Sequence, residues 1–130
     1  MANKNDYKKQ AKMNKHQKGR LGEDIAREHL VRQGFSILEH GFKCKLGEVD
    51  LVAEKEKELY FVEVKTRWSS NYGDPLESIT FIKQRQVIKA ARFYLAKKRR
   101  LQAFCHLSAI GVDMSGAEPK VEFIKDAFEI

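Results

Sequence analysis

Three ionisable residues interrupt apolar segments that a folded domain would bury. Asp50 lies within residues 48–52, and Glu63 and Lys65 lie within residues 59–66. Removing an unpaired carboxylate from water costs several kcal/mol, so these acids need partners in the folded chain. Their positions indicate a metal site.

A third acid is expected to join them from a helix. Residues 21–33 have helical spacing of apolar residues, and on a helical wheel Glu23 falls beside Leu30 and one turn from Ala26, so it faces inward. Like charges about 4 Å apart repel by roughly 4 kcal/mol at an effective dielectric constant of 20. A divalent cation would offset this repulsion, and oxygen ligands without imidazole or thiolate favour Mg²⁺ or Mn²⁺ over zinc.

These groups are the parts that phosphodiester hydrolysis uses. A metal lowers the pKa of bound water and neutralises a phosphate oxygen, while Lys65 orients the nucleophile or stabilises the developing charge. A structural alternative stays open. Glu63 and Lys65 would then belong to cross-strand ion pairs on a solvated sheet, and Asp50 would be a surface acid near a turn.

Two strands joined by a turn must position the acids. Residues 49–53 and 59–66 are rich in β-branched residues, and the four charged residues between them predict a hairpin turn. A four-residue turn would place Asp50 opposite Phe61, with Asp50 and Glu63 as diagonal neighbours on one face. A one-residue slip would separate them.

The remaining pattern completes one α/β domain. A short strand is expected at residues 35–38, a basic loop at residues 41–47 and a surface loop at residues 68–75. The second helix and the last two strands are expected at residues 78–98, 104–112 and 121–124.

The predicted order is helix, three strands, helix, two strands. The first three strands form an antiparallel meander, and the next strand joins the sheet after the long helix crosses one face. The result is a mixed sheet flanked by helices. One side of the long helix is expected to carry Ile79, Ile82, Gln86, Ala90 and Tyr94.

The net charge of +7 is unevenly distributed. Residues 1–20 contain seven Lys or Arg residues against one acid, so residues 1–17 are expected to be a flexible basic arm and residues 18–130 a single domain. A second basic cluster, which contains no acid, runs along the expected long helix and just past its end: Lys83, Arg85, Lys89, Arg92, Lys97, Lys98, Arg99 and Arg100. Both clusters suit nucleic acid, although basic tails are often only solubilising.

Composition sets the broad class. The chain has 130 residues, of which 42% are apolar and 33% charged, as in ordinary globular domains. No apolar stretch approaches the roughly 20 residues of a membrane span, and the N-terminus lacks a signal core. Two cysteines are too few for a disulfide scaffold, so we expect a cytoplasmic protein.

Several sequence blocks together resemble a known group of proteins. They are Gly19–Glu23 (GRLGE), Cys44–Val52 (CKLGEVDLV), Phe61–Arg67 (FVEVKTR), Tyr72–Glu77 (YGDPLE), Lys83–Arg85 (KQR) and Ala90–Leu95 (AARFYL). With Asp50 followed by Glu63-Val64-Lys65, the chain resembles the PD-(D/E)xK nuclease superfamily. More closely, it resembles the YraN-like family of small bacterial endonuclease-like proteins.

This resemblance implies a restriction-endonuclease-like αβββαβ core with a nuclease site. Asp50 and Glu63 would be metal ligands for Mg²⁺ or Mn²⁺, with the carbonyl of Val64 as a third. Lys65 would be the catalytic lysine, and Glu23 an inward acid of the site.

The resemblance also implies contacts with nucleic acid. Lys83 and Arg85 would approach it from the second helix, and Arg67 and Lys43 would add further positive charge. Glu48 and Arg67 have a structural alternative, in which each forms an ion pair within the fold.

The chain departs from the family pattern in two places. Relatives tend to carry asparagine and arginine where this chain has Gly41 and Lys43, and an Arg-Phe-Asp run where it has His106-Leu107-Ser108. The second departure would remove a supporting salt bridge or relax activity, but the core carboxylates are retained.

The sequence favours a metal-dependent endonuclease that acts on DNA. A non-catalytic nucleic-acid-binding module with the same fold is the main alternative. A third possibility is an interaction partner in a larger DNA-processing or transport assembly, with the basic arm as the docking segment. Fold alone does not choose among them.

Overall fold

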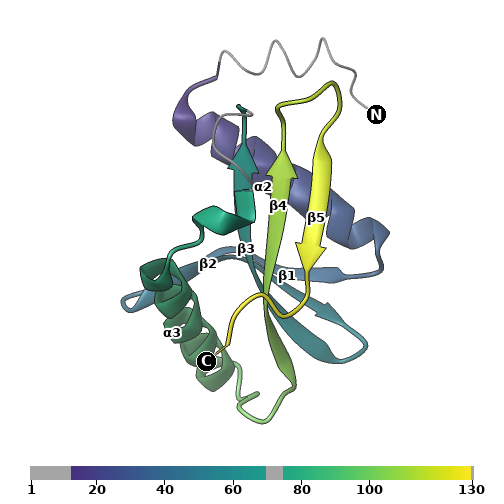
Figure 1. Cartoon of the computed structure of the whole chain (residues 1–130). Coiled ribbons are helices and arrows are strands. Elements are labelled where there is room, and N and C mark those ends of the chain that lie inside the picture. Colours follow the sequence, from purple (N-terminus) through teal and green to yellow (C-terminus); the bar gives the residue numbers. More distant parts are fainter. Residues whose placement is uncertain (1–12, 70–74, 130) are drawn as a thin grey trace.

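A five-stranded mixed sheet forms the framework of this chain. The computed structural model describes residues 13–69 and 75–129, and the strand order is β1-β2-β3-β4-β5. The elements are α2 (Lys15–Arg32), β1 (Ser36–Cys44), β2 (Gly47–Lys55), β3 (Glu58–Arg67), the short 3₁₀ helix η2 (Pro75–Ser78), α3 (Phe81–Lys97), β4 (Cys105–Asp113) and β5 (Lys120–Ile124) (Figure 1). The predicted order and the α/β class are confirmed.

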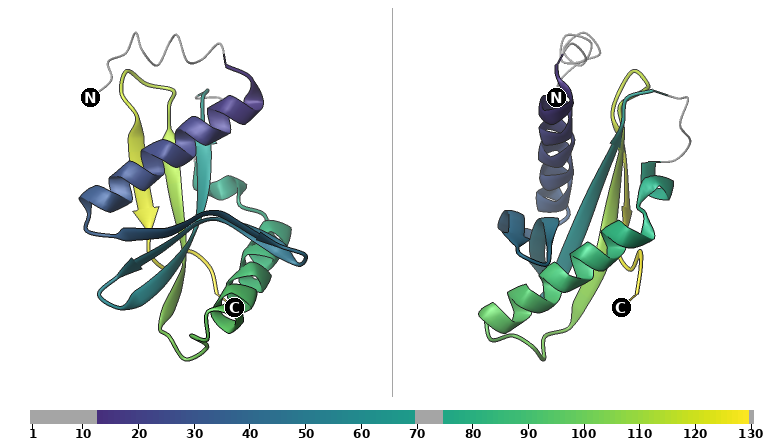
Figure 2. Two further views of the ribbon diagram at one scale, coloured as in Figure 1. Left: turned by 180° about the vertical axis from the view of Figure 1, so that it is seen from behind. Right: turned by 90° about the vertical axis from the view of Figure 1, so that its left-hand side faces the viewer.

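The sheet separates two helices, each with its own apolar core. Figure 2 shows α2 on one face and α3 on the other. On the α2 face, Ala26 and Leu30 pack against Leu51, Val62 and Ile110. Because β4 pairs parallel to β3, α3 is the crossover expected between them.

The α3 face has a second core. Val87, Ala91 and Tyr94 pack there against residues that include Val52 and Phe61. The predicted inward side of this helix was wrong at Ile82, whose exposed fraction is 70%, and at Gln86, which is also exposed. Among the described residues, no helix is both long and apolar enough to cross a membrane.

Helix α2 begins earlier than predicted, because a capping box precedes it. The Asn14 side chain accepts a hydrogen bond from the Gln17 N–H at 2.9 Å, and the Gln17 side chain accepts one from the Asn14 N–H at 3.0 Å. Residues 1–12 of the expected arm lie outside the described residues, whereas Lys15–Gln17 are helical.

Most of the predicted basic loop is strand, so that prediction was wrong. β1 continues to Cys44 and pairs with β2 up to Cys44↔Gly47, which leaves only Lys45 and Leu46 as a turn. The cause is packing, since Phe42 and Cys44 contact the apolar core on the α3 face. Loops are rarely buried in this way, because their backbone groups need partners.

The predicted register of the β2–β3 hairpin was also wrong. The turn has two residues, Glu56 and Lys57, with φ of 52° and 68°, as in a type I′ turn. Ala53 therefore pairs with Tyr60 instead of Glu58. A shift of two residues keeps each side chain on its face.

The departure at residues 106–108 has an internal explanation. The two ring nitrogens of His106 lie 2.7 Å from carboxylate oxygens of Glu58 and Asp126, and the Ser108 hydroxyl donates to the Lys125 carbonyl. These side chains tie the segment after β5 to β4. The His106 ring therefore has a carboxylate on each side, one from β3 and one from the segment after β5.

The contact between β2 and α3 gives a first prediction. Gly47→Ala is expected to lower the free energy of unfolding by about 1–3 kcal/mol, because the added Cβ would lie 2.1 Å from the Gln86 carbonyl oxygen. Gly19→Ala is the matched control, since its Cβ would have nothing within 4 Å. Urea unfolding measures both, and equal midpoints would contradict the close packing.

Candidate active site

The candidate site lies where β2 and β3 part. Their pairing runs from Lys55↔Glu58 to Leu51↔Val62 and goes no further. Just beyond it, an Asp50 carboxylate oxygen accepts a hydrogen bond from the Val64 N–H at 2.8 Å. The Asp50 side chain thus pairs with the Val64 N–H, which would have bonded to β2 if the β2–β3 pairing had continued. The same hydrogen bond fixes the Asp50 carboxylate beside β3.

Glu63 is the most unusual residue of the site. Its exposed fraction is 1%, although buried carboxylates are rare unless paired. Burial, followed by the hydrogen bond and charge of Asp50, raises the pKa of Glu63 to about 9. Its Oε1 atom is buried without a hydrogen-bond partner among the described residues. One carboxyl oxygen is therefore left to bind something else.

Glu23 reaches the same place from α2, because the helix approaches β3 at Gly22. A Cβ on Gly22 would lie 1.8 Å from the Thr66 hydroxyl oxygen, so a larger residue would push the helix away. Burial, followed by the charge of Asp50, raises the pKa of Glu23 to about 7. Glu23 therefore exchanges a proton near neutral pH.

Lys83 enters the site from the first turn of α3, which begins after the N-cap Thr80. Its Nζ atom lies 3.0 Å from a Glu48 oxygen and 3.6 Å from a Glu63 oxygen. Burial alone would lower the pKa of Lys83, but the neighbouring carboxylates, chiefly Glu63 and Glu48, raise it overall. Lys83 is therefore a cation in this structure.

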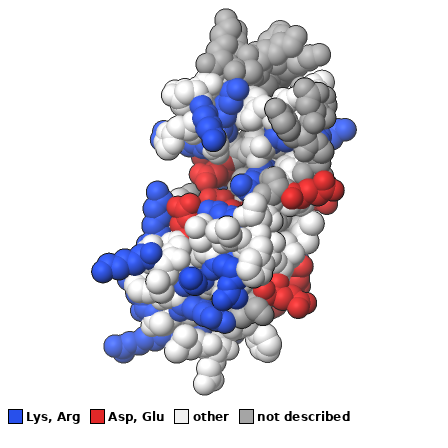
Figure 3. All heavy atoms as spheres, turned by 60° about the vertical axis from the view of Figure 1, so that its left-hand side comes forward, with Lys and Arg blue, Asp and Glu red and all other residues white. Residues whose placement is uncertain are grey.

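These groups line one open cleft of about 500 Å³ between α2, α3 and the sheet. On the face shown in Figure 3, acidic side chains gather in a hollow with basic side chains around it. The lining residues are Lys15, Lys18, Gly19, Glu23, Asp50, Glu63, Val64, Lys65, Thr66, Trp68 and Lys83. The structure thus brings together all the predicted catalytic and metal-binding residues, and Lys83 with them.

Three residues predicted to contact nucleic acid do not line this cleft. Arg67 forms an ion pair with Asp113 on β4, as in the structural alternative for this residue. That hydrogen bond is the main reason why the pKa of Asp113 falls to about 2. Arg85 and Lys43 are exposed, on α3 and β1.

The sequence interpretation missed part of the cleft wall. Lys15, Gly19 and Glu23 are spaced i, i+4 and i+8, so they share a face of α2, but the helix had been predicted to start later. The missed signal is the Asn14-x-x-Gln17 capping box. Lys18 and Trp68 also line the cleft, with the ammonium 5.4 Å from the ring centroid.

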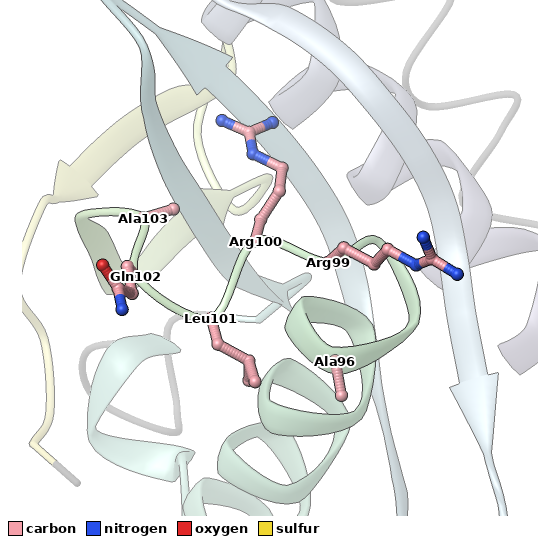
Figure 4. A pocket seen from close by; sticks show the side chains of 6 residues that line it. All are labelled: Ala96, Arg99, Arg100, Leu101, Gln102 and Ala103. Atoms are coloured by element: carbon pink, nitrogen blue, oxygen red, sulfur yellow. The ribbon is translucent and has the colours of Figure 1, made fainter.

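A second hollow lies at the end of α3 and does not resemble an active site. Its six lining residues are Ala96, Arg99, Arg100, Leu101, Gln102 and Ala103, which include no acid and no nucleophile. The two guanidinium groups point away from each other in Figure 4. Arg100 instead donates to Glu54 at 2.8 Å and holds the loop against β2.

The donor set decides how a metal would be held. Within residues 13–69 and 75–129, no three Asp, Glu, His or Cys side chains converge closely enough to hold an ion by themselves. Asp50 and Glu63 remain as a carboxylate pair, with the main-chain carbonyl of Val64 next in the strand. The unpartnered Glu63 oxygen fits a hard cation, which prefers oxygen ligands.

Comparison with known proteins identifies the family. The model described as "Uncharacterised protein family UPF0102" matches residues 22–112. This chain belongs to that family. The UPF0102 proteins are the YraN-like group, so the resemblance seen in the sequence is confirmed.

Individual UPF0102 relatives match over most of their length. A UPF0102 protein of Geobacter metallireducens is 46% identical over 112 residues, covering 86% of this chain and 92% of the relative. A UPF0102 protein of Caldanaerobacter subterraneus is 41% identical over 120 residues, covering 90% of this chain and 98% of the relative.

One solved structure is similar at a lower level. Pyrococcus furiosus SfsA in complex with Ca²⁺ matches with a TM-score of 0.39 and 19% identity, over 85% of this chain and 62% of that one. A likeness this weak says nothing about the activity of the UPF0102 chain.

The raised pKa values predict an unusual pH dependence for this UPF0102 protein. Glu63 and Glu23 have folded pKa values of about 9 and about 7, against 4.5 in a model peptide. The stability that these two protonated groups contribute is fully present below pH 4.5. It is lost as the pH rises through the folded pKa values of about 7 for Glu23 and about 9 for Glu63. In EDTA, the free energy of unfolding should therefore fall by more than about 1 kcal/mol between pH 5 and pH 9.

Urea titrations at several pH values measure this dependence. Glu63→Gln removes the larger titration, so its stability should vary less with pH and should exceed that of the wild type at pH 9. Glu122→Gln, at an exposed site on β5, is the control and should follow the wild type. A flat wild-type profile would contradict the burial of Glu63 as a protonated group.

Proposed function

We propose that this protein is a metal-dependent phosphodiesterase that cuts nucleic acid, with DNA as its first expected substrate. The observation that carries the proposal is the buried Glu63 carboxyl, which meets Asp50 and has an unpartnered oxygen in an open cleft. Burying such a group costs stability. A structural role would be served equally well by an apolar residue.

The metal expected at Asp50, Glu63 and the Val64 carbonyl is Mg²⁺ or Mn²⁺. When bound, such an ion supplies an activated water and neutralises charge on a phosphate oxygen. Asp50 is already oriented for binding by the Val64 N–H, so it loses little freedom when the ion arrives.

The remaining cleft residues supply positioning and proton transfer. Lys65 follows Glu63 by two residues on β3 and acts on it electrostatically, so its charge is available to a phosphate beside the carboxylates. Glu23, with a pKa of about 7, is suited to accept or donate a proton near neutral pH.

The outer face of α3 supports nucleic acid as the ligand. Arg85, Lys89 and Arg92 are exposed at spacings of four and three residues, so they form one stripe about 10 Å long. None of the three forms a salt bridge with a described residue. Lys83, which lines the cleft, precedes the stripe by two residues on the same helix. Along one strand of duplex DNA the phosphates recur about every 3.4 Å of helix axis, so a stripe of this length can meet about three of them.

The cytoplasm is the expected location of this activity. Cys44 and Cys105 are both free thiols, which is usual for proteins of a reducing compartment.

Cleavage assays test the catalytic proposal directly. Single-stranded, duplex and branched DNA and RNA are incubated with Mg²⁺ or Mn²⁺, and the wild type should cut at least one of them. Asp50→Asn, Glu63→Gln and Lys65→Met should each lower the rate by about 10²-fold or more. Lys120→Met, at an exposed site on β5, should not. Metal-dependent activity that survives the first two changes would defeat the proposal.

Binding assays test the α3 stripe separately. Arg85→Ala, Lys89→Ala and Arg92→Ala combined should weaken binding and reduce the salt slope by about 3, at roughly 0.9 per phosphate contact. Lys120→Ala is the control. Binding that keeps the wild-type salt slope in the triple variant would show that the stripe is not the contact surface. Salt-sensitive binding without metal-dependent cleavage would instead favour a non-catalytic binding module.

A further inference from the structure

The amine of Lys83 binds the carboxylate that a metal would need. It lies 3.6 Å from the Glu63 oxygen and 3.0 Å from the Glu48 oxygen. Among the residues that the structure describes, no other Lys, Arg or His forms a salt bridge with Glu63. The amine comes from α3, whereas both acids come from the sheet.

The charges of the cleft explain why this contact exists. Four acids lie together, namely Glu23, Glu48, Asp50 and Glu63, and the cleft is also lined by four lysines, Lys15, Lys18, Lys65 and Lys83. If all four acids were ionised they would carry a charge of −4, which is costly in a partly buried cleft unless it is offset. Protons on the raised-pKa acids and the amine of Lys83 both reduce that charge.

Lys83 is also placed so that it can leave. The exposed fraction of its side chain is 20%, and that of its partner Glu48 is 44%, whereas that of Glu63 is 1%. Glu48 therefore lies toward solvent, and it holds the amine at the shorter distance. Withdrawal from Glu63 would still leave Lys83 with an anionic partner.

We propose that Lys83 is the resident counter-ion of the site, a positioning residue that competes with a divalent cation for Glu63. This inference rests on the proposed function, because it assigns Glu63 to a metal. A doubly charged ion at Glu63 would repel the amine by several kcal/mol at this separation. Lys83 therefore moves toward Glu48 and the open cleft when the ion binds.

The released amine has a chemical use. In the open cleft it lies beside the carboxylates, where the phosphodiester of the proposed reaction would bind. Metal binding then frees a cation for the phosphate, so binding of metal and of nucleic acid support each other.

Calorimetric titration of Mg²⁺ into the full chain, without nucleic acid, tests the competition. It is run near pH 9, where protons compete less for Glu63 than at neutral pH. Lys83→Met should lower the Kd for Mg²⁺ about tenfold, because one repelling charge is removed. Lys83→Arg keeps the charge, so its Kd for Mg²⁺ should lie within about threefold of the wild-type value.

Lys89→Met is the matched control. It removes the same charge from the same helix at an exposed site without a salt bridge among the described residues. Its Kd should differ from the wild type by less than about twofold, because solvent screens an exposed charge. Lys83→Gln, which keeps a donor for Glu48, replaces Lys83→Met if thermal unfolding shows that the latter does not fold.

The outcomes separate the two proposals. Mg²⁺ binding that is equal or weaker in folded Lys83→Met or Lys83→Gln would overturn the competition and leave Lys83 a structural support. Binding by a charge-removed variant but not by the wild type would support it most strongly. If no form binds Mg²⁺, the proposed function fails as well.

Discussion

The hydrogen bond from the Val64 N–H to the Asp50 carboxylate is the interaction on which the site depends. It occurs where β2 stops pairing with β3, so it replaces a strand contact with a side chain. The sheet opens at this point without leaving that backbone donor unsatisfied. The opening gives Asp50 and Glu63 a shared space that a continuous sheet would fill.

Close helix packing then determines which residues join the carboxylates. Glycine at position 22 lets α2 approach Thr66, and glycine at position 47 lets α3 approach the backbone of β2. These two contacts bring Glu23 and Lys83 to opposite sides of the same cleft. Gly22 precedes Glu23 and Gly47 precedes Glu48 in the chain, so the packing contacts that stabilise the fold also position these charged residues.

The protein maintains this site at a cost in stability. Burial raises the pKa of Glu63 to about 9. The fold therefore loses stability as the pH rises toward this value, unless another positive charge replaces the proton. Lys83 provides part of that charge, and a divalent ion would provide more. Protons, lysine and metal are thus alternative ways to neutralise one carboxylate, and their competition links stability to function.

The amino-acid sequence by itself determined the class, the element order and the acids of the site. Out-of-place charges in two apolar strands identified Asp50, Glu63 and Lys65, because burial makes such charges costly wherever the strands lie. Only the tertiary structure decided the hairpin register and the pairing of Lys83. Glu56 and Lys57 are unusual residues for a type I′ turn, and Lys83 meets Glu63 only because α3 crosses the sheet there. Such contacts depend on packing between distant segments, which local spacing does not encode.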